Sequence, residues 1–312
     1  MRAGLLQRLR QFFDQRGFLE VETPLLSADV VIDQHLDPIS VLLPDDPRSL
    51  GQGRRLWLQT SPEFAMKRLM ASGGDAIYQV TRAFRMAEMG DLHNPEFTIV
   101  EWYRRDDTMQ DGMDLLSELA DALLDTGPAQ RISYAAAFER YVQIDPHRAT
   151  AEELESVVKK SGIALPENAS VKADRDTWLN LLLSEMLEPR LGQDGATILY
   201  DYPASQAALA RIRPDDPPVA ERFELYVRGV ELANGYNELV DPDELHQRNL
   251  KANAARLADQ KAALPQESRL LSAMRQELPH CTGVALGWDR LVMLASGASN
   301  ISEVMTFPID RA

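Results

Sequence analysis

Four alternate residues in segment 96–104 suggest a strand face that could do chemistry. The segment reads EFTIVEWYR, and the period of two in a strand places Phe97, Ile99, Glu101 and Tyr103 on one side. Glu101 would therefore share a face with apolar side chains. Because an unpaired buried carboxylate is costly, such a glutamate is either held by a structural partner or binds a cation. The periodicity alone leaves both alternatives open.

Two further carboxylates, Glu224 and Glu231, lie in segment 221–241, which reads ERFELYVRGVELANGYNELVD. The apolar alternation slips by one position beyond Gly229, and a β-bulge at this glycine is its simplest cause. The bulge would bring Glu224 and Glu231 onto the same face. Two converging carboxylates suggest a hard divalent cation such as Mg²⁺, which prefers oxygen ligands. The alternative is a pair of solvated glutamates on an edge strand.

The third stretch, residues 283–290, reads GVALGWDR. Glycines at the end of a strand allow a ligand to approach the backbone closely, and Arg290 in the first turn of a following helix could meet a phosphate or stack on a base. The spacing matches neither the phosphate-binding loop nor the dinucleotide fingerprint. It therefore argues against these two kinds of nucleotide site.

Short strand-like stretches would hold these three segments in place. They are rich in β-branched and aromatic residues and are separated by Gly, Pro, Asp and Asn, so they predict strands with mostly short connections and an antiparallel sheet. The expected strands span 18–22, 35–43, 54–60, 76–84, 96–104, 196–201 and 221–232, followed by a strand within 282–297 that runs into a helix.

Helical spacing begins at the first residues, where Leu5, Leu9, Phe12 and Phe13 form an apolar stripe and Gly17 stands where a C-cap glycine belongs. Further helices are expected at 109–124, 133–142, 150–161, 173–191, 242–263 and 267–277. We therefore expect an α+β fold with one domain over residues 1–312 and a helical insertion at roughly 108–191.

Composition bounds the class of protein. The 312 residues are 45% hydrophobic and 26% charged, which is typical of a globular chain, and the net charge of −15 opposes nonspecific attraction to nucleic acid. No apolar run is long enough to span a bilayer, and the first residues lack a secretory signal, so we expect a cytoplasmic protein. The single Cys281 agrees with a reducing compartment and is expected to be structural.

Taken in order, the segments resemble the signature motifs of class II aminoacyl-tRNA synthetases. GFLEVETPLL (17–26) resembles the first, dimer-forming motif, residues 84–98 with FRMAE and HNPEFT the second, and GVALGWDRLVML (283–294) the third. TSPEFAMKRL (60–69) and residues 223–239 resemble the lysyl-tRNA synthetase branch. The resemblance runs nearly end to end and implies an antiparallel sheet flanked by helices.

The resemblance also implies roles for individual residues in ATP-dependent amino-acid activation. Arg85, Glu231 and Arg290 would be the catalytic residues, and Glu224 and Glu231 would carry Mg²⁺. Phe97 would stack on adenine, and Gly287 would permit close approach of the nucleotide. The complete set implied for nucleotide binding is Arg85, Glu88, His93, Asn94, Phe97, Glu231, Leu232, Gly287 and Arg290. Glu88 stands three residues after Arg85, whereas this branch usually carries its glutamate two residues after the arginine.

A diamino acid would occupy the remaining positions, with Glu101 and Glu238 as partners of its side-chain ammonium. The residues implied for this substrate are Ser61, Glu63, Glu101, Tyr103, Asn234, Glu238 and Ala285. Ala285 stands where the lysyl-tRNA synthetases carry glycine. An added methyl there would crowd the α-amine of lysine and leave room for (R)-β-lysine.

Only about sixteen residues precede the first motif, whereas lysyl-tRNA synthetases place an anticodon-binding domain there. This arrangement resembles a synthetase paralogue that attaches a lysine-type residue to a lysine of elongation factor P, and it implies that tRNA is not the acceptor. Two alternatives are a stand-alone synthetase that charges tRNA and an inactive paralogue that senses amino acids. The first motif and the apolar stripe of the opening helix imply a homodimer, unless that stripe packs inside its own subunit.

Overall fold

The computed structural model describes residues 1–46, 48–49, 51–163 and 174–312. The chain forms two compact units, one of residues 1–108 and 238–312 and the other of residues 109–237. The helix expected over 173–191 begins at residue 173, which lies outside the described ranges. The expectation of one domain over the whole chain stays a prediction.

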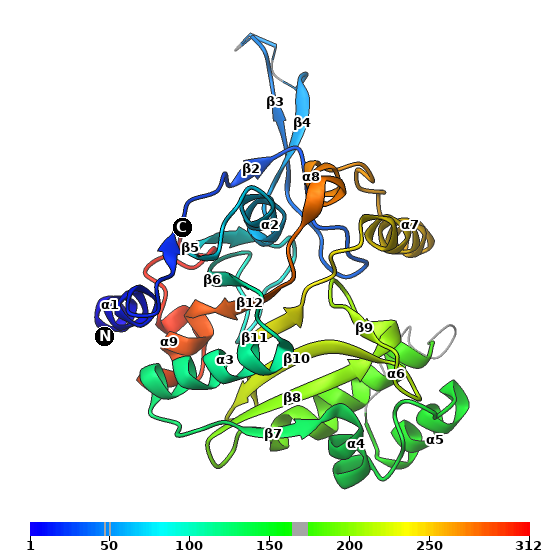
Figure 1. The fold of residues 1–312 in the computed structure, drawn as a ribbon. Helices are drawn as coiled ribbons and strands as arrows, with labels where there is room; N and C mark the ends of the chain where they lie inside the picture. The colour runs from blue at the N-terminus through cyan, green and yellow to red at the C-terminus, as the bar shows by residue number, and fades with distance from the viewer. Residues whose placement is uncertain (47, 50, 164–173) are drawn as a thin grey trace. The chain divides into compact units, whose positions relative to one another are not determined.

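The first unit is built on strands β1 (Leu19–Glu20), β5 (Ala76–Phe84), β6 (Glu96–Arg105) and β12 (Cys281–Gly287), which lie side by side in that order (Figure 1). The pairs β5–β6 and β6–β12 are antiparallel, whereas β1 pairs with β5 in parallel. Its helices are α1 (Arg2–Asp14), α2 (Glu63–Ala71), α7 (Pro242–Ala258), α8 (Arg269–Glu277) and α9 (Trp288–Ser296), with a 3₁₀ turn at Ile301–Glu303. Helix α2 packs on α8 and β6, and α9 packs on β6.

The apolar stripe of α1 is buried inside this unit. Leu9 and Phe13 are fully buried, and the ring of Phe13 stacks on Tyr78 of β5 and contacts Trp102 of β6. Burial of four apolar side chains on one face explains why this segment is an amphipathic helix. The stripe therefore finds cover within the chain and does not by itself require a second subunit.

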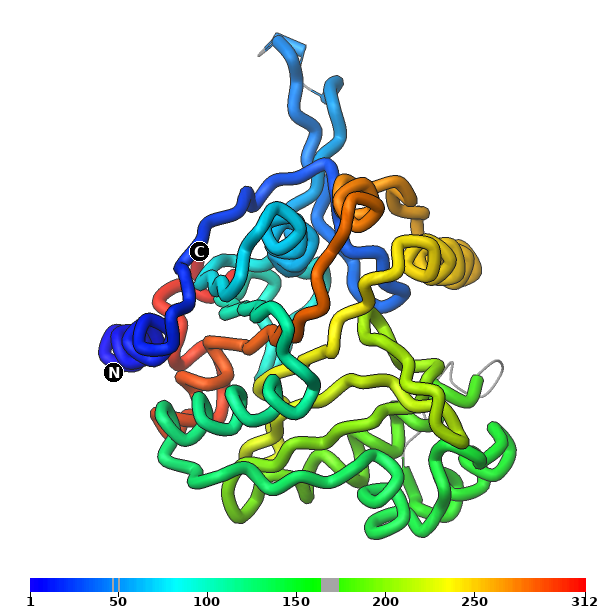
Figure 2. The backbone as a smooth tube through the Cα atoms, in the orientation of Figure 1, coloured from blue at the N-terminus to red at the C-terminus, as the bar shows by residue number. Residues whose placement is uncertain are grey.

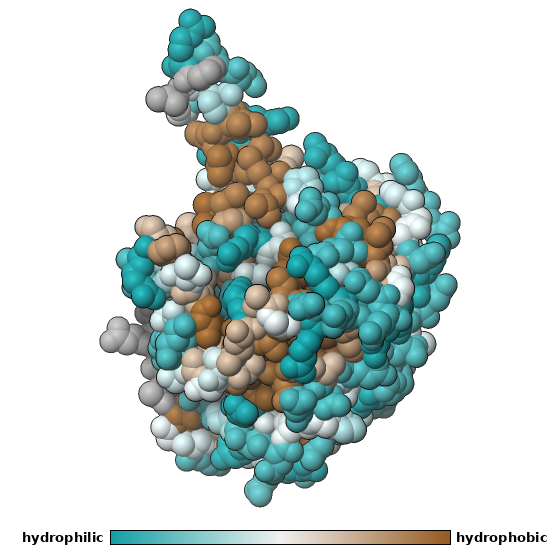
Figure 3. Space-filling model, turned by 90° about the vertical axis from the view of Figure 1, so that its left-hand side faces the viewer, coloured by the Kyte–Doolittle hydropathy of each residue, from teal (hydrophilic) through white to brown (hydrophobic). Residues whose placement is uncertain are grey.

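A small sheet of β2 (Leu26–Ser27), β4 (Arg54–Leu58) and β3 (Ser40–Leu43) also belongs to the first unit. The β3–β4 hairpin extends away from the rest of that unit (Figure 2). Its stem is apolar on the face seen in Figure 3. Leu42 and Leu43 of β3 are exposed.

The second unit contains strands β7 (Gln130–Ser133), β8 (Ala196–Pro203), β9 (Ile212–Arg213), β10 (Val219–Val227) and β11 (Val230–Asn237). Their order is β11-β10-β8-β7, and β9 pairs with β10. The helices are α3 (Met109–Leu124), α4 (Tyr134–Val142), α5 (Ala151–Lys160) and α6 (Arg175–Leu182), followed by a π turn at Leu183–Leu187 and 3₁₀ turns at Glu188–Arg190 and Ala204–Gln206. Helix α3 packs on β8, β10 and β11, and α4 packs on β8.

The expected α+β class is confirmed, with differences in detail. Helix α2 and strands β2, β7 and β9 were not expected, and β1 and β7 each pair in parallel with a neighbour. The expected single strand over 221–232 is wrong, because Arg228 and Gly229 form a two-residue turn with φ of 51° and 76°. Such a turn joins β10 and β11 as a hairpin and favours glycine at its second position. The proposed β-bulge at Gly229 is therefore wrong.

Within the described ranges, no helix is both long and apolar enough to cross a membrane. The single cysteine, Cys281, is buried as a free thiol at the start of β12. Burial and the nearby carboxylate of Glu238 raise the pKa of this thiol, which agrees with its expected structural role.

Candidate active site

Glu101 lies on the buried face of β6, and its carboxylate accepts hydrogen bonds from two hydroxyl groups. Ser61 Oγ donates to Oε2 at 2.7 Å, and the Tyr103 hydroxyl donates to Oε1 at 2.6 Å. Ser61 comes just before α2, and it also accepts a hydrogen bond from the Glu63 backbone N–H. Both donors to Glu101 are neutral, so these contacts do not neutralise its charge.

Two more carboxylates meet at the buried Lys67 of α2. Lys67 Nζ lies 2.5 Å from Glu63 Oε1 and 2.6 Å from Glu238 Oε2. The lysine is 2% exposed and Glu238 is 1% exposed. Glu63 and Lys67 are four positions apart on a helix, which places them on the same side of it. Lys67 thus bridges its own helix to the residue that follows β11.

The cluster holds more negative than positive charge. Burial and repulsion by Glu63 raise the pKa of Glu101 to about 7. Burial raises the pKa of Glu238 to about 8, although Lys67 opposes the shift. Burial lowers the pKa of Lys67, but its two carboxylate partners more than offset this and keep it protonated. The arrangement favours the entry of another cation.

Small residues of β12 lie beside this cluster. In the antiparallel pair β6–β12, Gly283 is opposite Tyr103 and Ala285 is opposite Glu101, so the two positions share one face. A Cβ at Gly283 would collide with Glu238 Oε1 and with the ring of Tyr103. Glycine is therefore required there, whereas Ala285 already places a methyl group next to Glu101.

Arg85 follows β5, and its guanidinium lies near an aromatic ring and a carboxylate. Its guanidinium lies 5.0 Å from the centroid of the Phe97 ring, and Nη1 lies 3.7 Å from Glu88 Oε2. The Nε atom is buried and has no hydrogen-bond partner among the described residues. Burial of a hydrogen-bond donor without a partner costs free energy, and a bound ligand would remove this cost.

His93, in the loop between β5 and β6, contacts Arg290 of α9. Arg290 Nη2 lies 2.7 Å from His93 Nε2, and desolvation together with the Arg290 charge lowers the pKa of the histidine. Arg290 stands in the first turn of α9, whose N-cap is Gly287. Asn94 accepts a hydrogen bond from the Ile309 backbone N–H.

Glu224 of β10 is the centre of a hydrogen-bond network in the second unit. The hydroxyl groups of Tyr202 and Tyr226 both donate to its Oε2. Arg222 Nη2 lies 2.5 Å from Oε1, and Asn234 Nδ2 lies 3.2 Å from the same oxygen. Asn234, expected next to the diamino acid, is thus a partner of Glu224.

A shift of register in the β10–β11 hairpin brings Glu231 to the face of Tyr226. Leu225 pairs with Ala233, whereas Tyr226 pairs with Glu231, so Leu232 is an extra residue in β11. An extra residue reverses the alternation of the strand beyond it. Glu224 and Glu231 therefore lie on one face, but because of a turn and a shift at the buried Leu232 rather than a bulge at Gly229.

Comparison with known proteins places these observations in a family. Residues 1–311 match the family described as tRNA synthetases class II (D, K and N). The chain belongs to this family. It is 44% identical to an elongation factor P–(R)-β-lysine ligase of Salmonella arizonae and 45% identical to one of Klebsiella pneumoniae. Each comparison spans 311 residues, all of this chain and 94% of the relative.

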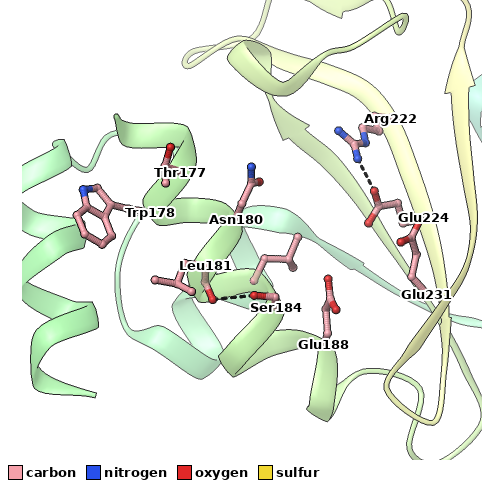
Figure 4. A pocket seen from close by; sticks show the side chains of 10 residues that line it. Thr177, Trp178, Asn180, Leu181, Ser184, Glu188, Arg222, Glu224 and Glu231 are labelled. Atoms are coloured by element: carbon pink, nitrogen blue, oxygen red, sulfur yellow. Dashed lines mark hydrogen bonds and ion pairs between the residues drawn. The ribbon is translucent and has the colours of Figure 1, made fainter. Parts of the chain in front are cut away.

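The Mg²⁺ site implied by the class II resemblance can be tested against the residues present. Glu188, Glu224 and Glu231 line a pocket of about 470 Å³ between the hairpin and helix α6 (Figure 4). However, the four donors to Glu224 take up the roughly four lone-pair positions of a carboxylate. In the part of the chain that the structure describes, no group of three or more His, Cys, Asp or Glu side chains is arranged to hold a metal ion. Glu224 therefore fits a cation only if one of its four donors leaves. These four contacts place no such condition on Glu231.

Sequence reasoning missed two kinds of residue in this class II chain. Lys67 could have been found, because a glutamate and a lysine four positions apart in SPEFAMK indicate a helix with an ion pair. Arg222, Tyr202 and Tyr226 gave no such signal, because only the register of the strands brings them to Glu224.

Proposed function

We propose that this protein is an ATP-dependent, AMP-forming ligase that activates (R)-β-lysine and transfers it to a lysine side chain of elongation factor P. The observation that carries the proposal is the buried cluster with three carboxylates and one lysine, with Ala285 opposite Glu101. It suits an amino acid whose side chain ends in an ammonium. Membership of the class II family and the names of the relatives support the same reaction.

The reaction has two steps. A carboxylate oxygen of the amino acid attacks the α-phosphorus of ATP, the bond between the α-phosphorus and the bridging oxygen breaks, and pyrophosphate leaves. The ε-amine of the acceptor lysine then attacks the acyl carbon, forms an amide, and releases AMP and a proton. No protein nucleophile is needed, because positioning and charge neutralisation can supply most of the acceleration.

Arg85 and Arg290 are proposed to neutralise the phosphates of ATP. The buried Arg85 Nε without a partner suits the α-phosphate, whose charge grows as the carboxylate attacks. Phe97, which lies under the Arg85 guanidinium, is proposed to stack on adenine. His93, held by Arg290, and Asn94, held by the C-terminal segment, are proposed to complete the nucleotide site together with Glu88, Leu232 and Gly287.

The carboxylate cluster is proposed to bind the diamino acid. Glu101 and Glu238 would receive its side-chain ammonium, since their raised pKa values indicate too little positive charge around them. Ser61, Glu63 and Tyr103 hold the cluster in shape. Asn234 is proposed to contribute a polar contact to the diamino acid, on the strength of the class II resemblance.

Mg²⁺ is proposed to accompany ATP, with Glu231 as its protein ligand and Glu224 as a ligand only after exchange of a donor. When bound, the cation would offset phosphate charge. A titration of pyrophosphate exchange with Mg²⁺ tests this assignment. Glu231→Gln should raise the Mg²⁺ concentration needed for half-maximal exchange, and an unchanged requirement would contradict the assignment.

The decisive experiment is ATP–pyrophosphate exchange across a panel of amino acids that contains both lysine isomers. Wild-type protein should respond to lysine-type amino acids, and Arg85→Ala should reduce exchange by about a hundredfold or more, as loss of a transition-state charge partner does. Arg82→Ala is the matched control, since Arg82 lies three residues away and is exposed on β5. Absence of exchange with every amino acid would instead favour the sensor alternative.

The acceptor is tested separately. With a net charge of −15, productive binding of tRNA should be weak at physiological salt. Elongation factor P should become labelled, and lysine tRNA should not. Charging of tRNA without labelling of the factor would favour a stand-alone synthetase.

Two further proposals concern the setting of the protein. A homodimer, typical of the first motif, should give twice the chain mass by light scattering at micromolar concentration, and a monomer mass would contradict it. A place in the cytoplasm follows from the proposed acceptor, and fractionation of cells tests it.

A further inference from the structure

Lys67 has no assigned role in the proposed reaction, although its charge is buried in the first unit. Lysines are almost never fully buried unless they are paired. Lys67 is 2% exposed and pairs with two carboxylates, one on its own helix and one after β11. Its ammonium therefore decides how much negative charge the cluster keeps.

Lys67 pairs with only one of the two carboxylate oxygens of Glu238. Glu238 Oε2 is held by Lys67, and Oε1 lies against Gly283 and the ring of Tyr103. The hydroxyl of that tyrosine donates to Glu101. Lys67 thus fixes the side-chain position that brings Glu238 Oε1 to the Tyr103 ring beside Glu101.

The titratable and charged groups around the cluster come from several elements. Helix α2 supplies Glu63 and Lys67, β6 supplies Glu101 and Tyr103, and the thiol of Cys281 on β12 lies close to Glu238. With all carboxylates ionised, three negative charges face one ammonium. A second ammonium would reduce this imbalance.

We propose that Lys67 is a positioning residue that holds Glu238 in its binding rotamer and supplies the resident positive charge that keeps this carboxylate and Glu101 available to a substrate ammonium. The inference rests on the proposed function, because it assumes a diamino acid as substrate. Without Lys67, the carboxylates repel one another more strongly and hold protons to higher pH. Fewer of them are then ionised at neutral pH, and the substrate ammonium binds less well.

The test is Lys67→Met, which keeps the length of the side chain and removes its charge. The KM for the diamino acid is measured by pyrophosphate exchange from pH 6 to 9.5. The acid limb of the KM profile should move upward by about one pH unit or more, so that KM rises about tenfold near pH 7 and recovers at high pH. The kcat should change much less. Lys251→Met, at an exposed lysine of α7 in the same unit, is the control and should leave the profile in place.

A purely structural role would raise KM equally at every pH, and that result would overturn the inference. A second measurement uses wild-type protein, in case the variant does not fold. Calorimetric titration with lysine near pH 7, in buffers of different ionisation enthalpy, should show release of protons on binding. Binding without proton release would also overturn the inference. Absence of any binding of lysine or β-lysine to wild-type protein would overturn the proposed function itself, and the inference with it.

Discussion

Glu224 and Glu238 are both buried glutamates, 4% and 1% exposed, but the protein stabilises them differently. Glu224 receives two tyrosine hydroxyls, a guanidinium and an amide, so each oxygen has two donors. Glu238 has the ammonium of Lys67, which it shares with Glu63. One carboxylate is saturated and the other is not.

The difference separates a carboxylate whose hydrogen-bond positions are all filled from one whose negative charge is only partly balanced. A saturated network fixes the shape of its surroundings, and the tyrosines around Glu224 show it, since burial and the carboxylate raise their pKa values well above the ordinary range. The cluster around Glu238 keeps excess negative charge. Burial alone therefore does not distinguish the two carboxylates, whereas the balance of donors does.

The largest effect is expected from replacing each glutamate by its amide. Glu224→Gln leaves Arg222, whose side chain is 20% exposed, without its counter-ion and should lower the free energy of unfolding by about 2–4 kcal/mol. Glu238→Gln removes charge from a cluster that has too much, so its loss should be about 1 kcal/mol or less. Urea denaturation at pH 7.5 measures both. Equal losses would contradict the comparison.

A smaller effect is expected from a methyl group at Gly283. The new Cβ would meet Tyr103 and Glu238, so Gly283→Ala should lower the free energy of unfolding by about 1–3 kcal/mol and raise the KM for the diamino acid. Gly4→Ala is a control, because nothing lies within 4 Å of a Cβ built there. A Gly283→Ala variant with wild-type KM would show that Glu238 is not part of the ammonium site.

Ala285, opposite Glu101 on the same face, offers the reverse substitution. A methyl-sized change in a pocket is worth about 1–3 kcal/mol of discrimination, or roughly ten- to two-hundredfold. Ala285→Gly should therefore raise exchange with α-lysine relative to (R)-β-lysine by about that factor. Parallel assays of both isomers measure the ratio. An unchanged ratio would remove Ala285 as the selectivity residue.

Much of the fold could be predicted from local pattern. Helix α3 spans 109–124 as expected, and strand β5 spans 76–84 as expected, because their apolar periods are long and regular. Helix α2 was missed, since its buried positions include Glu63 and Lys67, and charged residues at core positions hide the apolar stripe. The turn at Gly229 was missed because a slip in alternation has the same appearance for a bulge and for a hairpin.

Several residues of the buried cluster could be named from the sequence, but the charge balance of the cluster could not. Period two indicated the face of Glu101, and the structure places Ser61 and Tyr103 on its carboxylate. Lys67 comes from another element, and neither its distance to Glu238 nor the donors around Glu224 follow from spacing along the chain. Such contacts depend on register and packing, which a single sequence does not state.

The last prediction concerns stability against pH, which should depend on Glu101 and Glu238 in the buried cluster. The pKa of Glu101 rises from an ordinary 4.5 to about 7, and that of Glu238 rises to about 8. The folded protein therefore binds more protons than the unfolded chain between about pH 4.5 and 8. A raised pKa of this kind contributes stability that is complete below pH 4.5 and is lost as the pH rises to 8. Each group can change the free energy of unfolding by at most about 1.4 kcal/mol per pH unit within this window. Lys67 does not interfere, because its raised pKa matters only above its ordinary 10.5.

Urea midpoints from pH 5.5 to 8.5 should fall for the wild type and fall less for Glu101→Gln, in which one of the two groups no longer titrates. Saturating lysine should flatten the wild-type slope, because its ammonium takes the place of the proton, and equal slopes in all three samples would mean that the cluster is already neutralised.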